Sequence, residues 1–241
     1  MVDIHSHILP KTDDGAATML EALDMLRAAR RNGTKKIVCT PHFYNPRIGY
    51  VDKVRTGRIF DDLKEQAKEL DIEILLGSEV FCSDLFIEEI GKKEFFTLNG
   101  TDRLLIEFDF FDNFDRVLFA IDAVKKAGYV PVVAHPERYA FLMHDEYYVQ
   151  KLLSQDALLQ INTTSLSGKH GEHVTDFACW LLENRYACAV ASDAHDLSFR
   201  PTDMKSAFIW VYSHFPKDYA EELFFDNPQA IISGEKIIKR W

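Results

Sequence analysis

The sequence lacks the features that mark disulfide-stabilised, membrane-inserted and secreted proteins. It holds four cysteines in 241 residues; none forms a CxxC pair and each lies in or beside an apolar segment, which favours buried reduced thiols. No stretch approaches the roughly 18 apolar residues of a membrane span, so we expect no membrane insertion. The first residues hold neither a basic region nor a long apolar run. We therefore expect no signal peptide and a cytoplasmic location.

The sequence also has fewer basic than acidic residues. Lys and Arg number 28 against 38 Asp and Glu, a formal net charge of −10. This balance argues against a broad nucleic-acid-binding surface but not against small phosphorylated substrates. Hydrophobic residues make up 47% of the chain, as in a soluble globular protein. No linker rich in Pro, Gly or Ser divides the chain, so we predict one domain over residues 1–241.

Short apolar runs predict an α/β protein with a parallel sheet. Most lack polar alternation, as expected of strands covered on both faces. The seven runs cover residues 2–4, 36–40, 72–76, 103–108, 129–134, 157–161 and 187–191. Helical patterns separate them, after the capping box Thr18-Met-Leu-Glu21 and over residues 114–126 and 173–184. Seven βα units predict a closed or nearly closed barrel, with an open doubly wound sheet as the alternative.

Histidines and carboxylates gather where the predicted strands end. In barrels and α/β sheets, active sites are built on this rim. Taken singly, each such residue has an ordinary alternative as a helix cap, a salt-bridge partner or a polar rim residue. Together they predict a metal centre, because crowded carboxylates repel one another unless protons or cations neutralise them. The candidate ligands are His5, His7, Asp14, His42, Glu79, Glu107, His135, Asp193 and His195.

Nine candidate ligands exceed the three or four that one catalytic zinc ion takes from protein. They therefore predict two or three divalent ions bridged by carboxylates and water. Oxygen and nitrogen donors without cysteine suit Mn²⁺, Fe or Zn²⁺. Such clusters favour hydrolysis, since they supply hydroxide near neutral pH and polarise a phosphoryl or acyl oxygen.

Two arginines are placed on loops of the same rim. Arg138 follows His135-Pro-Glu, and Arg200 lies five residues past His195. Guanidinium groups bind phosphate oxygens in a bidentate manner, whereas the alternative is a surface arginine paired with a carboxylate or a helix end. Arg47 is a weaker third candidate, in a turn-rich segment that could face a substrate.

The remaining histidines lie away from the predicted strand ends. We interpret them as surface or capping residues, although the loop of residues 168–171 follows the sixth strand and should reach the rim. His170 and His173 are therefore the two that could approach the site. The set comprises His144, His170, His173 and His214.

In combination, several motifs resemble the polymerase and histidinol phosphatase (PHP) superfamily. Within it, the sequence is most similar to bacterial protein-tyrosine phosphatases of the CpsB/YwqE type, which act on tyrosine kinases controlling exopolysaccharide synthesis. The resemblance covers residues 1 to about 210, with Lys11-Thr12 as a departure before the acidic pair. The motifs are Asp3-Ile-His-Ser-His-Ile-Leu-Pro, Asp13-Asp-Gly15, Thr40-Pro-His42, Gly77-Ser-Glu79, His135-Pro-Glu-Arg138 and Ser192-Asp-Ala-His195.

This resemblance implies a distorted (βα)7 barrel of the PHP fold with three metal ions, commonly manganese, held by the nine ligands above. It also assigns phosphate binding to Arg138 and Arg200. The expected reaction is hydrolysis of phosphotyrosine in a bacterial tyrosine kinase that controls capsule or exopolysaccharide synthesis. A metal-activated hydroxide would attack phosphorus directly, without a phosphoenzyme.

Several alternatives stay open at this point. Histidinol-phosphate phosphatase, or another small-molecule phosphoesterase, would use the same metals. Phosphodiesterase or exonuclease action is disfavoured by the acidic balance. A metal-stabilised interaction module would bind a kinase tail without hydrolysing it. Residues 211–241 would either cover the barrel or dock a neighbouring subunit, so the sequence leaves an oligomer open.

Overall fold

The computed structural model describes residues 1–143 and 145–241, and its described strands all pair in parallel. They form two sheets, with the orders β1-β2-β4 and β3-β5-β6-β7-β8-β9. The strands are β1 (Val2–Ser6), β2 (Lys36–Cys39), β3 (His42–Phe43), β4 (Glu73–Leu76), β5 (Glu79–Phe81), β6 (Arg103–Glu107), β7 (Val130–Ala134), β8 (Leu158–Asn162) and β9 (Ala187–Ala191). Each of the seven predicted runs therefore overlaps with a strand.

Two neighbouring strands of the barrel are interrupted at the same level. The second run continues after Pro41 as β3, and the third continues after Gly77 and Ser78 as β5. Proline has no N–H to donate to a strand ladder. A Cβ atom at Gly77 would lie 3.0 Å from the side chain of Leu98 and 3.1 Å from that of Val38, so this break is closely packed. The break separates the two sheets, because β2 and β4 pair in one and β3 and β5 in the other.

The first and last strands close the barrel. The amide of His7 donates to the carbonyl of Ala194 (2.8 Å), and the amide of Asp193 donates to the carbonyl of His5 (2.9 Å). A parallel bridge joins Ser6 to Ala194. The predicted distorted barrel is thus confirmed, and the alternative of an open doubly wound sheet is wrong.

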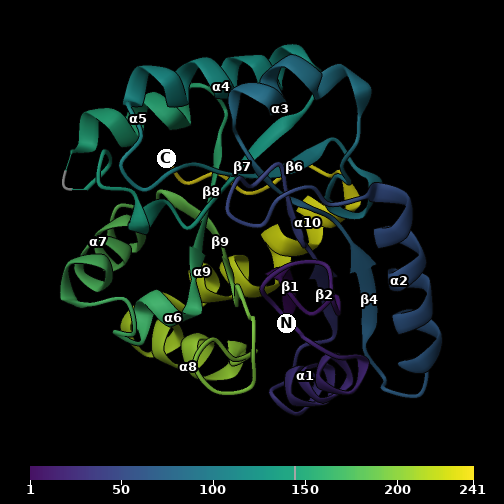
Figure 1. Ribbon diagram of the computed structural model, residues 1–241. Helices are drawn as coiled ribbons and strands as arrows, with labels where there is room; N and C mark the ends of the chain where they lie inside the picture. Colours follow the sequence, from purple (N-terminus) through teal and green to yellow (C-terminus); the bar gives the residue numbers. More distant parts are fainter. Residues whose placement is uncertain (144) are drawn as a thin grey trace.

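Helices surround the barrel; α1 to α7 lie between its strands in the sequence, and α8 to α10 follow the last strand (Figure 1). They are α1 (Met19–Arg31), α2 (Lys53–Gln66), α3 (Asp84–Glu89), α4 (Phe114–Lys126), α5 (Glu146–Ser154), α6 (Thr163–Leu166), α7 (Glu172–Glu183), α8 (Met204–His214), α9 (Lys217–Glu221) and α10 (Asn227–Ser233). Short 3-10 turns lie at Ile90–Lys92, Leu98–Gly100 and Pro136–Arg138, and a π-helical turn lies at Glu222–Asp226. Within the described part of the chain, no helix is both long enough and apolar enough to cross a membrane.

The capping box predicted for the first helix is present. The Thr18 hydroxyl accepts a hydrogen bond from the amide of Glu21 (3.1 Å), and the Glu21 carboxylate accepts one from the amide of Ala17 (2.9 Å). These bonds satisfy amides that the helix itself leaves free. The helix buries Met25 and Leu26 against the barrel.

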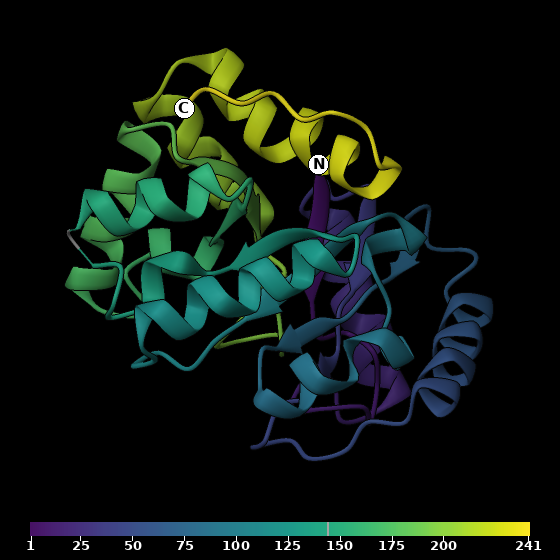
Figure 2. The ribbon, with the colours of Figure 1, turned by 90° about the horizontal axis from the view of Figure 1, so that it is seen from above.

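The C-terminal segment covers the amino-terminal end of the barrel. Ile231 and Ile232 of α10 are buried in the same cluster as Val2 and Ile4 of β1. The side-chain amide of Asn99 donates to the carbonyl of Ile232 (3.0 Å), which ties α10 to the barrel. Figure 2 shows this segment, in yellow, lying across one end of the molecule. Of the two predicted roles for residues 211–241, covering the barrel is the one that these contacts support.

Candidate metal centre

The nine predicted ligands lie together at the carboxyl ends of the strands. Eight of them are buried, and only Asp14 has a side chain that is about half exposed, at 47%. Three overlapping groups bring their donor atoms within 4.8 Å of one another. These groups are His5, His7, Glu79 and Asp193; His42, Glu79 and Glu107; and His7, Asp14, His42 and His195.

Glu79 lies at the centre of this cluster. Its Oε2 atom is 3.3 Å from Nε2 of His5, 3.2 Å from Nε2 of His7 and 3.1 Å from Nδ1 of His42. Its other oxygen, Oε1, lies 2.9 Å from Nε2 of His135. Each carboxylate oxygen thus faces different imidazoles, an arrangement suited to bridging cations.

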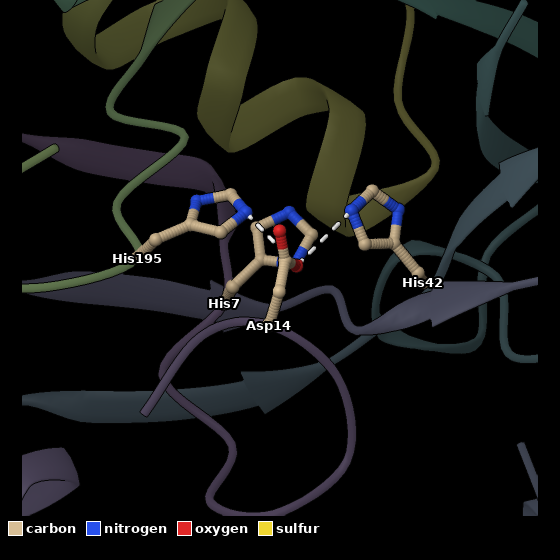
Figure 3. Close-up of side chains that lie close together, drawn as sticks. All are labelled: His7, Asp14, His42 and His195. Atoms are coloured by element: carbon tan, nitrogen blue, oxygen red, sulfur yellow. Dashed lines mark ion pairs between the residues drawn. The ribbon is translucent and has the colours of Figure 1, made fainter. Parts of the chain in front are cut away.

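Asp14 closes the cluster on the solvent side. Its Oδ1 atom lies 3.5 Å from Nε2 of His42 and 3.4 Å from Nε2 of His195, as Figure 3 shows. The following Gly15 makes this approach feasible, because a Cβ atom there would lie 1.9 Å from the carbonyl oxygen of His7. Any side chain at residue 15 would therefore push the Asp14 loop away from the rim.

Two of these ligands have a strained backbone. His135 has φ of 36° and Asp193 has φ of 49°, in the left-handed region that residues other than glycine rarely adopt. Such a conformation costs on the order of 1–3 kcal/mol per residue and persists where surrounding contacts enforce it. Here His135 directly follows β7, Asp193 lies two residues after β9, and both turn their side chains into the cluster. Strain of this kind is typical of functional sites.

Buried hydrogen bonds orient the imidazoles. Nδ1 of His5 donates to Oε1 of Gln160 (2.8 Å), and Nδ1 of His7 donates to Oδ2 of Asp13 (2.7 Å). Nδ1 of His195 donates to the carbonyl of Asp193 (2.9 Å). Each bond leaves Nε2 facing the cluster, where its lone pair is available to a metal ion. The two Nε2 atoms of His5 and His7 lie 3.2 Å apart.

Side-chain amides orient two of the carboxylates. Asn45 donates to Oε1 of Glu107 (2.8 Å), and Asn162 donates to Oδ2 of Asp193 (2.7 Å). Gln160 in turn donates to Oδ1 of Asn162 (2.9 Å). Sequence reasoning missed these residues and Asp13. A signal existed in β8, where Gln160 and Asn162 alternate within an apolar run and so point to one side of the strand.

Opposite charges control ionisation in the cluster. Burial opposes ionisation of Glu79, but the imidazoles of His5 and His42 outweigh it and hold the pKa of Glu79 well below its usual range. Burial likewise opposes protonation of His42, yet the carboxylates of Glu107 and Glu79 raise the pKa of His42 to about 9. A field that favours imidazolium also favours divalent cations, which displace such protons when they bind.

The donor set fits divalent metal ions. Nδ1 of His42, Oε2 of Glu79 and Nε2 of His195 are buried and form no hydrogen bond of suitable geometry with any described residue, although donor atoms of other proposed ligands lie 2.9 to 3.4 Å away. Unpaired buried polar atoms are costly, so a native site normally supplies them with a partner. Several carboxylate oxygens and imidazole nitrogens, with no thiolate among them, form an appropriate shell for Mn²⁺, Fe or Zn²⁺.

Both predicted phosphate-binding arginines lie at the mouth of the site. They line a cleft of about 580 Å³ whose floor includes Glu79 and Asp193. Nη1 of Arg138 lies 3.6 Å and Nη1 of Arg200 lies 3.7 Å from the same atom, Oδ2 of Asp193. The guanidinium of Arg138 also stacks 4.5 Å from the ring centre of Phe110. Two cations thus stand over the cluster and face the cleft.

Arg47 and His170 occupy the edge of the same cleft. Arg47 is 72% exposed and pairs with Asp109 (3.3 Å). His170 accepts or donates a hydrogen bond at Thr164 Oγ1 (3.0 Å), and burial together with Arg138 lowers the pKa of His170 to about 4. The general interpretation of these histidines as surface or capping residues does not hold for His170, whereas the expectation that its loop reaches the rim does.

The other histidines assigned to the surface lie apart from the cluster. His173 is exposed on α7, and His214 is exposed at the end of α8, where its ring stacks on Trp210. Their predicted roles are confirmed. His144 lies outside the described residues.

The fold and this cluster agree with the comparisons to known proteins. Residues 1–233 match the family model described as "Capsular polysaccharide synthesis, CpsB/CapC". The chain belongs to the CpsB/CapC family. Tyrosine-protein phosphatase CpsB of Streptococcus pneumoniae is 32% identical over 246 residues, which cover 98% of this chain and 100% of that protein. The family resemblance noted from the motifs is thereby confirmed.

The fold of this CpsB/CapC chain also matches those of solved structures. The chain matches a structure from a study of YwqE of Bacillus subtilis and CpsB of Streptococcus pneumoniae, described as metal-dependent tyrosine phosphatases, with a TM-score of 0.92. The sequence identity is 28%, and the match covers 100% of this chain and 97% of that one. A lactonase from Listeria monocytogenes shares the fold alone, with a TM-score of 0.59, 14% identity and coverage of 98% and 95%.

Proposed function

We propose that this chain is a metal-dependent protein-tyrosine phosphatase acting in the cytoplasm. Its substrate would be phosphotyrosine of a bacterial tyrosine kinase that controls capsule or exopolysaccharide synthesis. The observation that carries the proposal is the buried cluster of histidines and carboxylates beneath Arg138 and Arg200. Membership of the CpsB/CapC family and the names of its relatives support it. We further propose that residues 1–241 form one domain.

Three ions would share the nine ligands. His5, His7, Glu79 and Asp193 would hold one, and Asp14, His42 and His195 would hold another. Glu79 and Glu107, joined by His135, would hold the third. The family resemblance favours Mn²⁺ among the metals that suit these donors. Bound divalent ions lower the pKa of water and neutralise phosphoryl charge.

The two arginines would bind and orient the phosphoryl group. Its non-bridging oxygens carry negative charge, and each guanidinium offers a fork of N–H donors that matches them. Asp193 and the ring of Phe110 hold Arg138 at the mouth of the cleft, so little conformational freedom remains to be lost on binding. Arg47, exposed at the edge, would contact the substrate beyond the phosphate. A phenolate leaves readily, so we assign no general acid.

A cysteine-based reaction does not fit the structure. The spacing of cysteine phosphatases, Cys-x5-Arg, does occur at Cys179 and Arg185. Cys179, however, lies inside α7, where burial and the carboxylate of Glu183 raise the pKa of its thiol. The guanidinium of Arg185 stacks 4.0 Å from the ring centre of Tyr219. A nucleophilic thiolate requires the opposite environment, in which positive charge lowers the pKa.

Metal depletion tests the proposal. Chelated protein should lose hydrolysis of an aryl phosphate, and addition of Mn²⁺, Fe²⁺ or Zn²⁺ should restore it in proportion to the bound metal measured by elemental analysis. Glu79→Gln should lower kcat/KM at least about a thousandfold, since metal electrostatics are worth several kcal/mol. The exposed Glu88→Gln is the matched control. Full turnover in metal-free protein would exclude this function.

Substrate class requires a second comparison. A phosphotyrosyl peptide should be turned over with a higher kcat/KM than histidinol phosphate on the same metal-loaded sample. The reverse order would assign the chain to small-molecule phosphoesterases. Stable binding of phosphotyrosine without hydrolysis would indicate an interaction module instead.

A further inference from the structure

A second cleft lies beside the metal centre. It has a volume of about 490 Å³ and lies between residues 44–51 and the start of α3. Its lining is largely apolar and includes Tyr44, Pro46, Tyr50, Val51 and Leu85. None of the nine proposed metal ligands and neither phosphate-binding arginine lines it. The proposed reaction therefore leaves this cleft unexplained.

The cleft combines a packed floor with exposed apolar walls. Phe43 is buried, and the ring of Tyr44 packs edge-on against Phe86 with 5.4 Å between ring centres. By contrast, Tyr50 is 86% exposed and Leu85 is 54% exposed. Apolar side chains that gather in an exposed concave surface mark sites of contact with other molecules.

One segment forms a wall of both clefts. Arg47 and Ile48 line the metal cleft, whereas Pro46 and Tyr50 line the apolar one. Asn45 lines both, and its amide is anchored to Glu107. A bound polypeptide that leaves the metal cleft across residues 44–51 would therefore enter the apolar cleft.

The charged residues that line the apolar cleft do not suit a second phosphate group. Nζ of Lys92, in this lining, is paired with Oε1 of Glu89 at 2.8 Å, and the lining also includes Glu94. A phosphate would be repelled by these carboxylates, whereas an uncharged side chain would bury apolar surface against Tyr50 and Leu85. A small alcohol phosphate has no second group to fill this space.

From these observations we propose that the apolar cleft binds an aliphatic or aromatic side chain of the polypeptide that flanks the phosphotyrosine. This inference rests on the proposed phosphatase function and defines its substrate further. The cleft would supply binding energy outside the reacting group and so select proteins with an apolar residue near the phosphotyrosine.

A walking series of peptides tests the subsite. Each peptide has one phosphotyrosine in a Gly-Ser background, with a single Leu placed in turn at each of several positions before and after it. One position should raise kcat/KM about tenfold over the peptide without Leu, the effect of burying part of one side chain in an apolar pocket. Equal kcat/KM for all peptides would overturn the subsite.

Variants connect that preference to the cleft. Tyr50→Ser combined with Leu85→Ser should remove most of the Leu preference and lower the ratio of peptide to aryl phosphate kcat/KM about tenfold. The control is Tyr147→Ser, which replaces a tyrosine by serine at a residue on α5 that is 61% exposed and does not line the cleft. It should leave the preference and the ratio unchanged. A preference that survives the double variant would place the subsite elsewhere and overturn the proposal. Melting temperatures confirm that both variants are folded.

Two further outcomes separate the explanations. If light scattering shows a dimer that Tyr50→Ser and Leu85→Ser dissociate, with peptide preference unchanged, the cleft binds a second copy of the chain and the subsite proposal is wrong. If the metal-loaded wild type fails to hydrolyse even the aryl phosphate, the proposed function fails and the subsite fails with it. Aryl phosphate turnover without a Leu preference contradicts the subsite alone.

Discussion

The side chains of His7 and Asp13 form a buried hydrogen bond of 2.7 Å between Nδ1 and Oδ2. Asp13 belongs to none of the metal-binding groups, yet its side chain is only 1% exposed. The same oxygen accepts a hydrogen bond from the amide of His42 (3.0 Å). One carboxylate thus positions two proposed ligands, and it turns Nε2 of His7 toward Glu79 and Asp193, 3.2 and 3.4 Å away.

Loss of this carboxylate should weaken metal binding. We expect Asp13→Ala to lower metal affinity about 10- to 100-fold, as is typical when the partner of a ligating histidine is removed. Added Mn²⁺ should recover much of the aryl phosphatase activity, because the ligands themselves remain. Metal titrations by activity and by calorimetry measure the shift. The exposed Asp61→Ala is the control, and equal affinities of the two variants would show that Asp13 does not position His7.

The arginines should affect transition-state binding without changing metal content. We expect Arg138→Ala and Arg200→Ala each to lower kcat/KM roughly 10²- to 10³-fold, the usual effect of removing a donor from a developing oxyanion. Arg138→Lys should recover only part of the activity, since lysine lacks the planar fork. Arg58→Ala, at an exposed residue of α2, provides the control. Wild-type kcat/KM in either alanine variant would remove that arginine from the phosphate site.

Thiol titration should find one accessible cysteine in the native protein. Cys39, Cys82 and Cys188 are buried, whereas Cys179 is partly exposed. Burial raises the pKa of Cys39 and Cys188 to about 12, so few thiolates form below that pH. A disulfide-exchange reagent should therefore modify one thiol per chain, and Cys179→Ala should abolish that reaction. Rapid modification of two or more thiols before denaturant is added would contradict the predicted burial.

The C-terminal helix should contribute to stability rather than to catalysis. Ile231 is fully buried at the end of the barrel opposite the metal centre. Ile231→Ala should lower the free energy of unfolding by about 2–5 kcal/mol, as large-to-small core substitutions do. Denaturant melts measure this change, with Ile238→Ala at a residue 45% exposed as the control. A fall in kcat/KM well below the melting temperature would contradict a purely structural role.

Most of the fold was predictable because its signals are local. Buried parallel strands appear as short apolar runs, and Thr18 with Glu21 marks the start of a helix. The barrel then brings all carboxyl strand ends to one rim, so the position of His5 or Glu79 after a run was enough to place it in the cluster. Strand order did not have to be known.

Other features depended on contacts between distant parts of the chain. The pairing of Asp13 with His7 and the breaks at Pro41 and Gly77 had no decisive signal in local pattern. The Cys179-x5-Arg185 spacing shows the opposite case, since the spacing matches but its cysteine lies inside a helix, where the thiol cannot act as the nucleophile.

The sequence by itself determined which residue types stand at the strand ends, and with them the barrel and the candidate ligands. Only the tertiary structure decided which atoms of those ligands face one another, which carboxylate positions rather than binds, and where an apolar cleft adjoins the site. The reason is physical. Hydrophobic period and spacing act along the chain, whereas side-chain direction and hydrogen-bond pairing are set by packing between segments far apart in sequence.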